Sequence, residues 1–243
     1  MPDRRRHRGA HPRDRELFSA AAFETLASAV RDYAWLITRG YAAVASLKLV
    51  GDRYALVERQ RAAVTRVACS DAARARRLAT QSRHDALAER TLAIDGFNVI
   101  ISLEAALGGG FGLLGLDGAR RDLASVHGTY RRVLETPSAI DLSLAALVCC
   151  APGGVTWYLD RPVSNSGKLA GVIRERCAAH GLGWTVELVD HVDREVSRPG
   201  VIALSADGGV LDSAESWFDL GGWVVQHQIP GAWTLDFSQL EAR

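Results

Sequence analysis

The stretch that decides the fold is Thr91–Leu107, TLAIDGFNVIISLEAAL. A short apolar run, Leu92–Ile94, ends abruptly at Asp95-Gly96, and apolar residues then recur with helical spacing. We therefore expect a buried strand, a tight turn that carries Asp95, and a helix that begins near Asn98. Ligands of open α/β sheets bind beyond the carboxyl ends of the strands, so chemistry is expected at this turn.

Composition defines the class of protein. Of the 243 residues, 48% are hydrophobic and 23% are charged, which favours a packed core in one large domain or two small ones. No apolar run approaches the length of a membrane span, and the basic N-terminus lacks the apolar segment of a secretory signal. The four cysteines lack the spacing of a zinc site or a CxxC motif, so free thiols and a cytoplasmic location are expected.

The net charge of +1 conceals a split between two parts of the chain. Residues 1–90 carry 18 Lys and Arg against 10 Asp and Glu, which gives +8, whereas residues 91–243 carry 11 against 18, which gives −7. A basic part suggests contact with a polyanion, and an acidic part could hold a cation. Solvated helix faces are the simpler explanation for many of the arginines.

Three regions are expected along the chain. Residues 1–13 are rich in Arg, His and Pro and predict a flexible basic arm. Residues 14–90 show helical periodicity with breaks near Gly40 and Gly51 and predict a basic α-helical domain. Residues 91–243 alternate strand and helix patterns, which predicts an α/β domain with a mainly parallel sheet.

The elements expected in the last region are as follows. After Leu92–Ile94, strands are expected at Val155–Leu159, Trp184–Val189, Val201–Leu204 and Trp223–Val225, and Ile229–Phe237 either adds an edge strand or wraps the surface. Helices are expected over 117–133, 139–149, 164–180 and 211–217, and the glycine-rich segment 108–115 is expected to be a loop.

Acidic residues stand at the ends of three of these strands, namely Asp95, Asp160 and Asp207, and Asp212 follows five residues later. The third strand ends at Asp190, with Asp193 just beyond it. Several carboxylates that converge at one edge repel one another unless a cation binds between them. Oxygen ligands of this kind suit Mg²⁺ or Mn²⁺, which can generate a hydroxide nucleophile and stabilise the leaving oxygen in phosphodiester cleavage.

Two motifs in this part of the sequence resemble those of a known family. Ile94–Ile100, IDGFNVI, resembles the opening motif of PIN-like nucleases, particularly the NYN branch, and Leu204–Asp212, LSADGGVLD, is similar to their late motif. The resemblance covers residues 91–226 and implies a PIN-like, Rossmann-like fold that hydrolyses RNA with a divalent metal. It implies that Asp95 and Asp207 bind metal, with Asp160 and Asp212 next in line and Asn98 orienting Asp95 or a water.

Other positions stay open at this stage. The late motif is stretched by Gly208-Gly209, and Glu104 competes with Asp122 for the acidic position expected on an intervening helix. Ser164, Asn165, Ser166 and Lys168 could bind a phosphate at a helix N-terminus, although capping also explains the three polar residues. Arg120 and Arg121 could line an RNA path or simply face solvent on a helix.

Three functions follow from these observations. The first is a metal-dependent ribonuclease whose helical domain grips RNA, with DNA open as a substrate. The second is a phosphatase of the haloacid-dehalogenase type, which is disfavoured because Phe97 stands where that fold has a second acid. The third is a non-catalytic RNA-binding or adaptor protein. A homodimer and an unidentified protein partner are also open, and the two-part layout resembles an uncharacterised bacterial and archaeal family.

Overall fold

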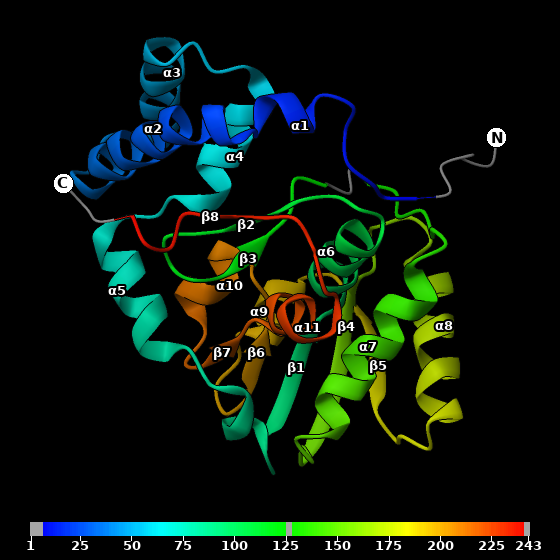
Figure 1. Ribbon diagram of the computed structural model, residues 1–243. Helices are drawn as coiled ribbons and strands as arrows, with labels where there is room; N and C mark the ends of the chain where they lie inside the picture. Colours follow the sequence, from blue (N-terminus) through cyan, green and yellow to red (C-terminus); the bar gives the residue numbers. More distant parts are fainter. Residues whose placement is uncertain (1–6, 125–127, 241–243) are drawn as a thin grey trace.

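A five-stranded parallel sheet of order β5-β4-β1-β6-β7 forms the centre of the computed structural model, which describes residues 7–124 and 128–240 (Figure 1). Its strands are β1 (Thr91–Asp95), β4 (Gly154–Asp160), β5 (Thr185–Val189), β6 (Ile202–Leu204) and β7 (Trp217–Phe218). In register, Leu92 of β1 lies between Val155 of β4 and Ile202 of β6. The chain extends from β1 to β4 and β5 on one side and then crosses to β6 on the other. The strand order therefore switches direction between β1 and β6.

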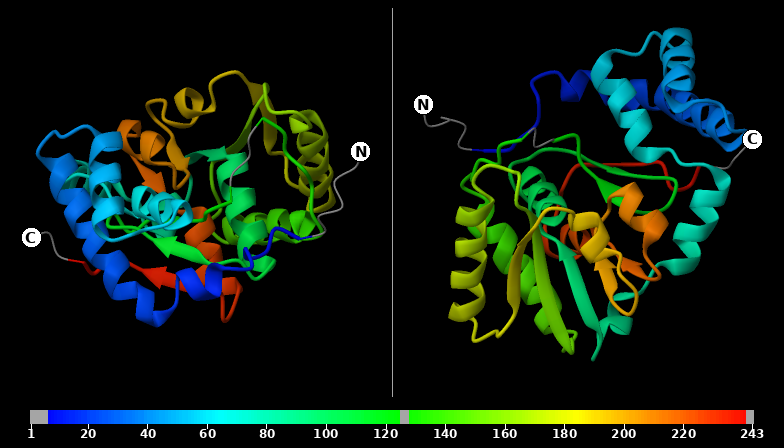
Figure 2. Two further views of the ribbon diagram at one scale, coloured as in Figure 1. Left: turned by 90° about the horizontal axis from the view of Figure 1, so that it is seen from above. Right: turned by 180° about the vertical axis from the view of Figure 1, so that it is seen from behind.

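Helices cover both faces of this sheet (Figures 1 and 2). One face carries α6 (Gly96–Leu107), α7 (Thr136–Val148), α8 (Ser166–Ala179) and α11 (Leu220–Gln228), and the other carries α9 (Val192–Val196) and α10 (Gly208–Ser213). Alternation along β1 explains the two layers: Leu92 and Ile94 belong to the core beneath α6, and Ala93 belongs to the core beneath α9. Gly96 lets α6 start against β4, because a Cβ there would lie 3.0 Å from the carbonyl oxygen of Tyr158.

The N-terminal helical region shares its core with a second, smaller sheet. Its elements are α1 (Asp14–Leu17), α2 (Ala20–Thr38), α3 (Ala43–Arg53), α4 (Glu58–Val67), α5 (Asp71–Thr80) and a 3₁₀ turn, η1 (His84–Leu87). The second sheet has the order β3-β2-β8 and comprises β2 (Gly112–Leu114), β3 (Arg120–Arg121) and β8 (Thr234–Asp236). Phe18 packs at a tilted angle against Phe111 with ring centroids 4.3 Å apart, and Phe237 is buried in the same cluster. The helices are therefore packed on strands that come from the middle and the end of the chain.

Most of the expected elements are confirmed. The fold is α/β, with a parallel sheet flanked by helices and an N-terminal helical region, and the strand–turn–helix unit around Asp95 forms as expected. The C-terminal segment adds a strand, β8, to the small sheet. Within residues 7–124 and 128–240, no helix is both long and apolar enough to cross a bilayer. Residues 1–6 of the expected arm lie outside the described part.

Three local predictions are wrong. Trp223–Val225 lies in α11, whose N-terminus is capped by Asp219, and Trp217–Phe218 forms the fifth strand instead. The helix expected over 117–133 is absent from the described part of that range, because Arg120–Arg121 pairs with β2 as an antiparallel strand. That pairing also turns part of the expected glycine-rich loop into β2. A short apolar run does not by itself distinguish strand from helix, and here tertiary pairing decides.

Candidate functional site

Asp95 occupies the end of β1 and caps the N-terminus of α6. One carboxylate oxygen accepts a hydrogen bond from the backbone N–H of Asn98 at 3.2 Å, and the other accepts one from the Ser205 hydroxyl at 2.9 Å. The side chain is buried, with 7% of the residue exposed. Burial, together with the nearby charges of Asp207 and Asp193, raises the pKa of Asp95 to about 7.

The late motif is tied directly to this turn. The Asn98 side-chain oxygen accepts a hydrogen bond from the backbone N–H of Ala206 at 2.9 Å, and the Ser205 hydroxyl accepts one from the backbone N–H of Asp207 at 3.0 Å. Asn98 therefore positions the loop that carries Asp207, while Ser205 bridges that loop to Asp95. The two motifs meet where the strand order switches, which is the usual ligand position in an open α/β sheet.

A pocket of about 420 Å³ opens beside these loops. Five carboxylates line it: Asp95, Asp122, Asp160, Asp193 and Asp207. Among the described residues, no lysine or arginine forms an ion pair with any of them. Burial raises the pKa values of Asp122, Asp160 and Asp193, and Asp193 also raises that of Asp160 by repulsion. The pocket therefore gathers five carboxylates that the described residues do not neutralise by direct ion pairs, although Arg66, Arg120 and Arg121 also line it.

The structure thus brings together three of the predicted acidic residues, Asp95, Asp160 and Asp207. It adds Asp193, whose α9 helix turns it back over the sheet edge after β5. Of the two candidates for the further acidic residue that the sequence left open, Asp122 lines the pocket and Glu104 does not. The strand end at Asp190 was a signal for Asp193, but only the short helix decides which of the two acids reaches the pocket.

Asp212 and Glu104, both predicted as metal ligands, do not line this pocket. Asp212 forms a bidentate ion pair with Arg77 at 2.7 Å, and this pairing turns its carboxylate to α5. Glu104 is fully buried and accepts hydrogen bonds from Arg8 Nε at 2.7 Å, from Thr136 at 2.5 Å and from Tyr130. Each carboxylate already has charged or hydroxyl donors from its own chain, which explains its position apart from the five pocket acids.

The predicted phosphate-binding loop lies next to the pocket and does not line it. Val163 lines the pocket, but the next residues fold back onto the segment at Gly128–Tyr130. Asn165 adopts a left-handed backbone (φ 70°) and donates a hydrogen bond to the carbonyl of Tyr130 at 2.9 Å. Lys168 is exposed on α8. Ser164 pairs through its backbone with Gly128 and Tyr130, and the Ser166 hydroxyl faces the carbonyl of Arg161 at 3.5 Å.

The two predicted substrate-binding arginines differ sharply, although they are adjacent on β3. Arg121 donates to both carboxylate oxygens of Asp117, at 2.8 and 2.6 Å, and to the carbonyl of Ala206 at 2.8 Å. Arg120 lines the same pocket, but its Nε and Nη2 atoms are buried without a hydrogen-bond partner among the described residues. Burial lowers the pKa of Arg120. Arg121 therefore links Asp117 to the late motif at Ala206, whereas Arg120 is a buried cation with two nitrogen atoms that lack a hydrogen-bond partner among the described residues.

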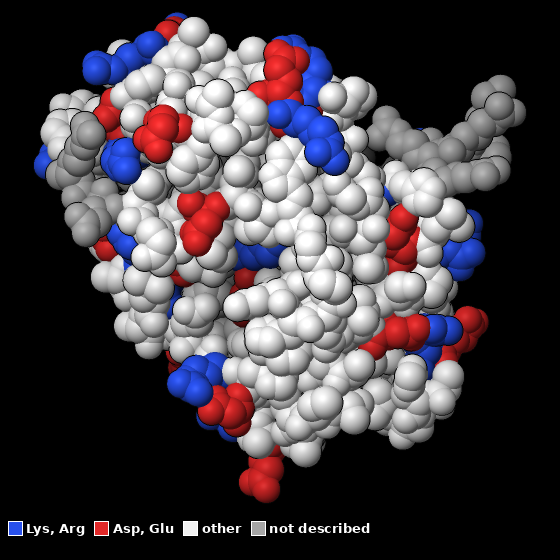
Figure 3. Space-filling model, viewed as in Figure 1, with Lys and Arg blue, Asp and Glu red and all other residues white. Residues whose placement is uncertain are grey.

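Most arginines of the helical region bind their own chain, which supports the simpler explanation of its basic charge. Arg59 pairs with Asp14, Arg61 with Asp52, and Arg77 with Asp117 and Asp212. On the face shown in Figure 3, basic and acidic side chains are interspersed over the helical region. Arg66 differs, because it is exposed in the last turn of α4 and lines the acidic pocket.

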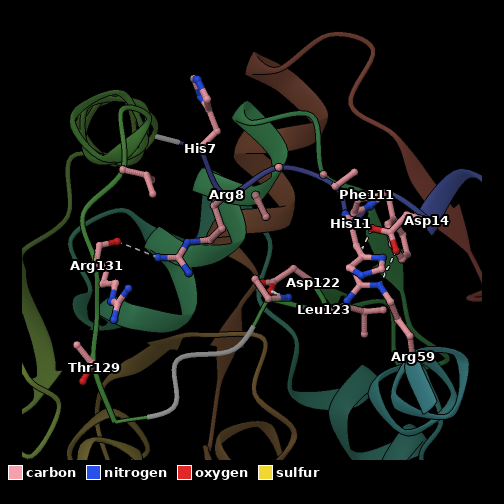
Figure 4. A pocket seen from close by; sticks show the side chains of 17 residues that line it. His7, Arg8, His11, Asp14, Arg59, Phe111, Asp122, Leu123, Thr129 and Arg131 are labelled. Carbon is pink, nitrogen blue, oxygen red and sulfur yellow. Dashed lines mark hydrogen bonds and ion pairs between the residues drawn. The ribbon is translucent and has the colours of Figure 1, made fainter. Parts of the chain in front are cut away.

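A larger cavity of about 960 Å³ lies beneath the N-terminal segment that begins at His7 (Figure 4). Arg8 points into it and donates to the carbonyl of Arg131 at 3.1 Å, while Arg59 and Asp14 pair on the opposite side. It shares Asp122 and Ala124 with the acidic pocket. Unlike the five carboxylates of the smaller pocket, its charged groups largely pair within the chain.

The chemistry of the donors defines what the acidic pocket can bind. Among the described residues, no group of three or more His, Cys, Asp or Glu side chains is arranged to hold a metal ion by itself. A closed zinc site of three or four protein ligands is therefore not formed by these residues. Mg²⁺ commonly binds through one or two carboxylates and keeps several waters, which is compatible with the paired loops that carry Asp95 and Asp207.

Comparison with known proteins identifies relatives without an assigned activity. Residues 84–223 match the family described as "Domain of unknown function (DUF5616)", and residues 25–79 match "Protein of unknown function (DUF434)". The chain is 34% identical over 181 residues to "Uncharacterized protein MJ0935" of Methanocaldococcus jannaschii, which covers 74% of this chain and 86% of that protein. No solved structure matches. Neither matching family is a PIN or NYN family, so the nuclease resemblance stays a prediction. The DUF5616 match spans more than half of the chain, and the protein belongs to this family.

Proposed function

We propose that this protein hydrolyses phosphodiester bonds in RNA with the help of Mg²⁺ or Mn²⁺. The observation that carries the proposal is the convergence of five carboxylates in one pocket at the switch point of a parallel sheet. The RNA part rests on the resemblance of the two Asp-containing motifs to those of NYN-type nucleases. The PIN-like assignment of the fold belongs to the same proposal.

The pocket residues fit a divalent cation on electrostatic grounds. The charges of Asp193 and Asp207 disfavour the charged form of Asp95, and the charge of Asp207 disfavours that of Asp193; a bound cation would reverse both effects. Asp95 and Asp207 would hold the ion, with Asp160 and Asp193 binding through its waters. Such an ion supplies a hydroxide nucleophile and stabilises the leaving oxygen.

The chain's own residues prepare this site. Ser205 and the N–H of Asn98 fix both carboxylate oxygens of Asp95, so its orientation is set before anything binds. The Asn98 side chain links α6 to the loop of Asp207 by accepting a hydrogen bond from the backbone N–H of Ala206. Phe97 lines the pocket beside Asn98 and packs at a tilted angle against Tyr130, with ring centroids 5.3 Å apart.

A second candidate is an RNA-binding or adaptor protein without catalysis. It is favoured by the finding that, in the described part of the chain, no three potential ligands form a metal-binding group on their own. This candidate predicts that RNA binding survives when the pocket carboxylates are neutralised.

Cleavage of a mixed pool of labelled structured and single-stranded RNAs, in Mn²⁺ or Mg²⁺, tests the proposal. Wild type is compared with Asp95→Asn and with Asp190→Asn, a matched strand-end control whose side chain is exposed outside the pocket. We expect metal-dependent cleavage by wild type and Asp190→Asn and none by Asp95→Asn. Equal cleavage by all three proteins would assign the activity to another site or to a contaminant. Absence of cleavage with intact RNA binding would favour the adaptor.

A further inference from the structure

The acidic pocket also has cationic lining residues. Arg66 comes from α4, within the segment that matches DUF434, and Arg120 comes from β3, within the segment that matches DUF5616. The two halves of the protein therefore contribute to one pocket.

Arg120 shows the stronger sign of a missing ligand. The residue is 4% exposed, and its guanidinium lies against Ser102, with Nη1 3.5 Å from the hydroxyl. Nε and Nη2 have no hydrogen-bond partner among the described residues, and the backbone N–H of Arg120, not its side chain, binds Asp219. A buried guanidinium with unused donors is costly unless a ligand satisfies it.

Arg121, the next residue on the same strand, differs from Arg120 because its guanidinium nitrogens all have hydrogen-bond partners. Its side chain donates two hydrogen bonds to Asp117 and one to the carbonyl of Ala206. The unused donors of Arg120 are thus not a general property of buried arginines in this small sheet. Arg120 has these unused donors because no carboxylate makes a hydrogen bond or ion pair with its buried guanidinium among the described residues.

Arg66 is a second positively charged residue that lines the pocket, and it lies at the surface. It is exposed at the pocket rim, and no hydrogen bond or ion pair joins its side chain to another residue in the described ranges. Its charge acts on Asp122, which lines the pocket with it. One arginine is therefore positioned at the entrance and one at the inner wall.

We propose that Arg66 and Arg120 bind a phosphate group of a single-stranded polynucleotide in the acidic pocket, so that the helical region completes the site. Guanidinium groups match phosphate oxygens through paired N–H donors, and the pocket volume is in the range of small-ligand sites. The inference rests on the proposed function, because it assigns the phosphate next to the acids that would hold the metal.

Binding can be measured separately from cleavage. Fluorescence anisotropy of a labelled single-stranded RNA of about 12 nucleotides, in Ca²⁺ and in EDTA, gives Kd for wild type, Arg66→Ala and Arg120→Met. Arg83→Ala is the control, because Arg83 is a strongly exposed arginine that does not line the pocket. Single-stranded DNA of the same sequence tests whether the sugar matters, and uridine 5′-monophosphate is compared with uridine as a competitor.

We expect each pocket variant to weaken binding by roughly tenfold to a hundredfold, and Arg83→Ala to leave it unchanged. Arg66→Ala should also reduce the slope of log Kd against log salt by about 0.7. The monophosphate should compete and uridine should not. Arg120→Met should keep or raise Tm, because it removes an unsatisfied charge, whereas Arg121→Met should lower it. A purely structural role for Arg120 predicts the opposite change in Tm.

The outcomes separate the two proposals. If wild type cleaves RNA but both pocket variants bind and cleave like Arg83→Ala, the phosphate assignment is wrong and the nuclease stands. If no RNA is cleaved but both variants lose affinity, the nuclease fails and the phosphate site stands. If wild type binds neither RNA nor DNA, or if uridine competes as well as its monophosphate, the phosphate site is overturned.

Discussion

Two carboxylates in this protein, Asp117 and Asp95, are both buried, but their pKa values are shifted in opposite directions. Asp117 lies between Arg77 and Arg121, with Asp212 on the other side of Arg77. Burial alone raises the pKa of Asp117, but the two arginines outweigh it and the pKa is lowered overall. Asp95 has no such partner among the described residues, and its pKa rises to about 7.

The comparison shows that burial alone does not determine the pKa of a carboxylate in this protein; the charged partners within the chain do so as well. The Arg77–Asp117–Arg121–Asp212 group, the ion-pair network, joins α5, β3 and α10 and is complete within the chain. The five pocket acids form no ion pair with a lysine or arginine among the described residues. The first arrangement holds the fold together, and the second is suited to binding.

The largest expected effect comes from opening the ion-pair network. Arg77→Met leaves Asp117 half paired and releases Asp212, and breaking a buried pair costs about 3 kcal/mol or more. Tm should fall by about 6–12 °C. Thermal unfolding measures this, with exposed Arg83→Met as the control. Equal Tm values for the two variants would contradict the structural role of the network.

The second effect has the opposite sign. Because the folded-state pKa of Asp95 is raised from 3.8 to about 7, its charge destabilises the fold progressively as pH rises between these values. Asp95→Asn should therefore raise the free energy of unfolding by about 2 kcal/mol at pH 8 and change it little at pH 4. Urea unfolding at both pH values measures it. A loss of stability at pH 8 would show that the carboxylate is charge-compensated in the native protein.

The third effect tests the proposed metal site and whether Asp207 or Asp212 belongs to it. Saturating Mn²⁺ at pH 8 should raise the Tm of wild type by about 3 °C or more. The rise should disappear in Asp207→Asn and persist in Asp212→Asn, because only Asp207 lines the pocket. An equal loss in both variants would place Asp212 in the metal site despite its pairing with Arg77.

The smallest effect concerns Glu104. This residue lies on α6, the helix that Asp95 caps, but like the acids of the ion-pair network it is paired within the chain. Arg8→Ala removes its cationic partner and leaves the Thr136 and Tyr130 donors, so we expect a loss of about 1 kcal/mol. Glu104→Gln in the Arg8→Ala background should recover part of it. A double-mutant cycle in urea measures the coupling, and additive losses would mean that the two side chains do not interact.

The site was predictable from sequence to the extent that it depends on strand ends. Asp95, Asp160 and Asp207 follow apolar runs directly, and parallel strands bring their carboxyl ends to one edge. Asp193 was not predictable in the same way, because its approach depends on how the short helix α9 packs on β1 and β4. Arg120 was expected on a helix, whereas strand pairing with β2 brings it to the pocket wall.

The sequence by itself determined the α/β class, the strand–turn–helix unit at Asp95 and the strand-end positions of three acids, because these follow from local periodicity and chain direction. Only the tertiary structure decided which charges pair. Arg77 and Asp212 are separated by 135 residues, and nothing in the sequence around either residue shows that they pair. An ion pair depends on the distance between two side chains after folding, and that distance is set by how α5 packs on α10.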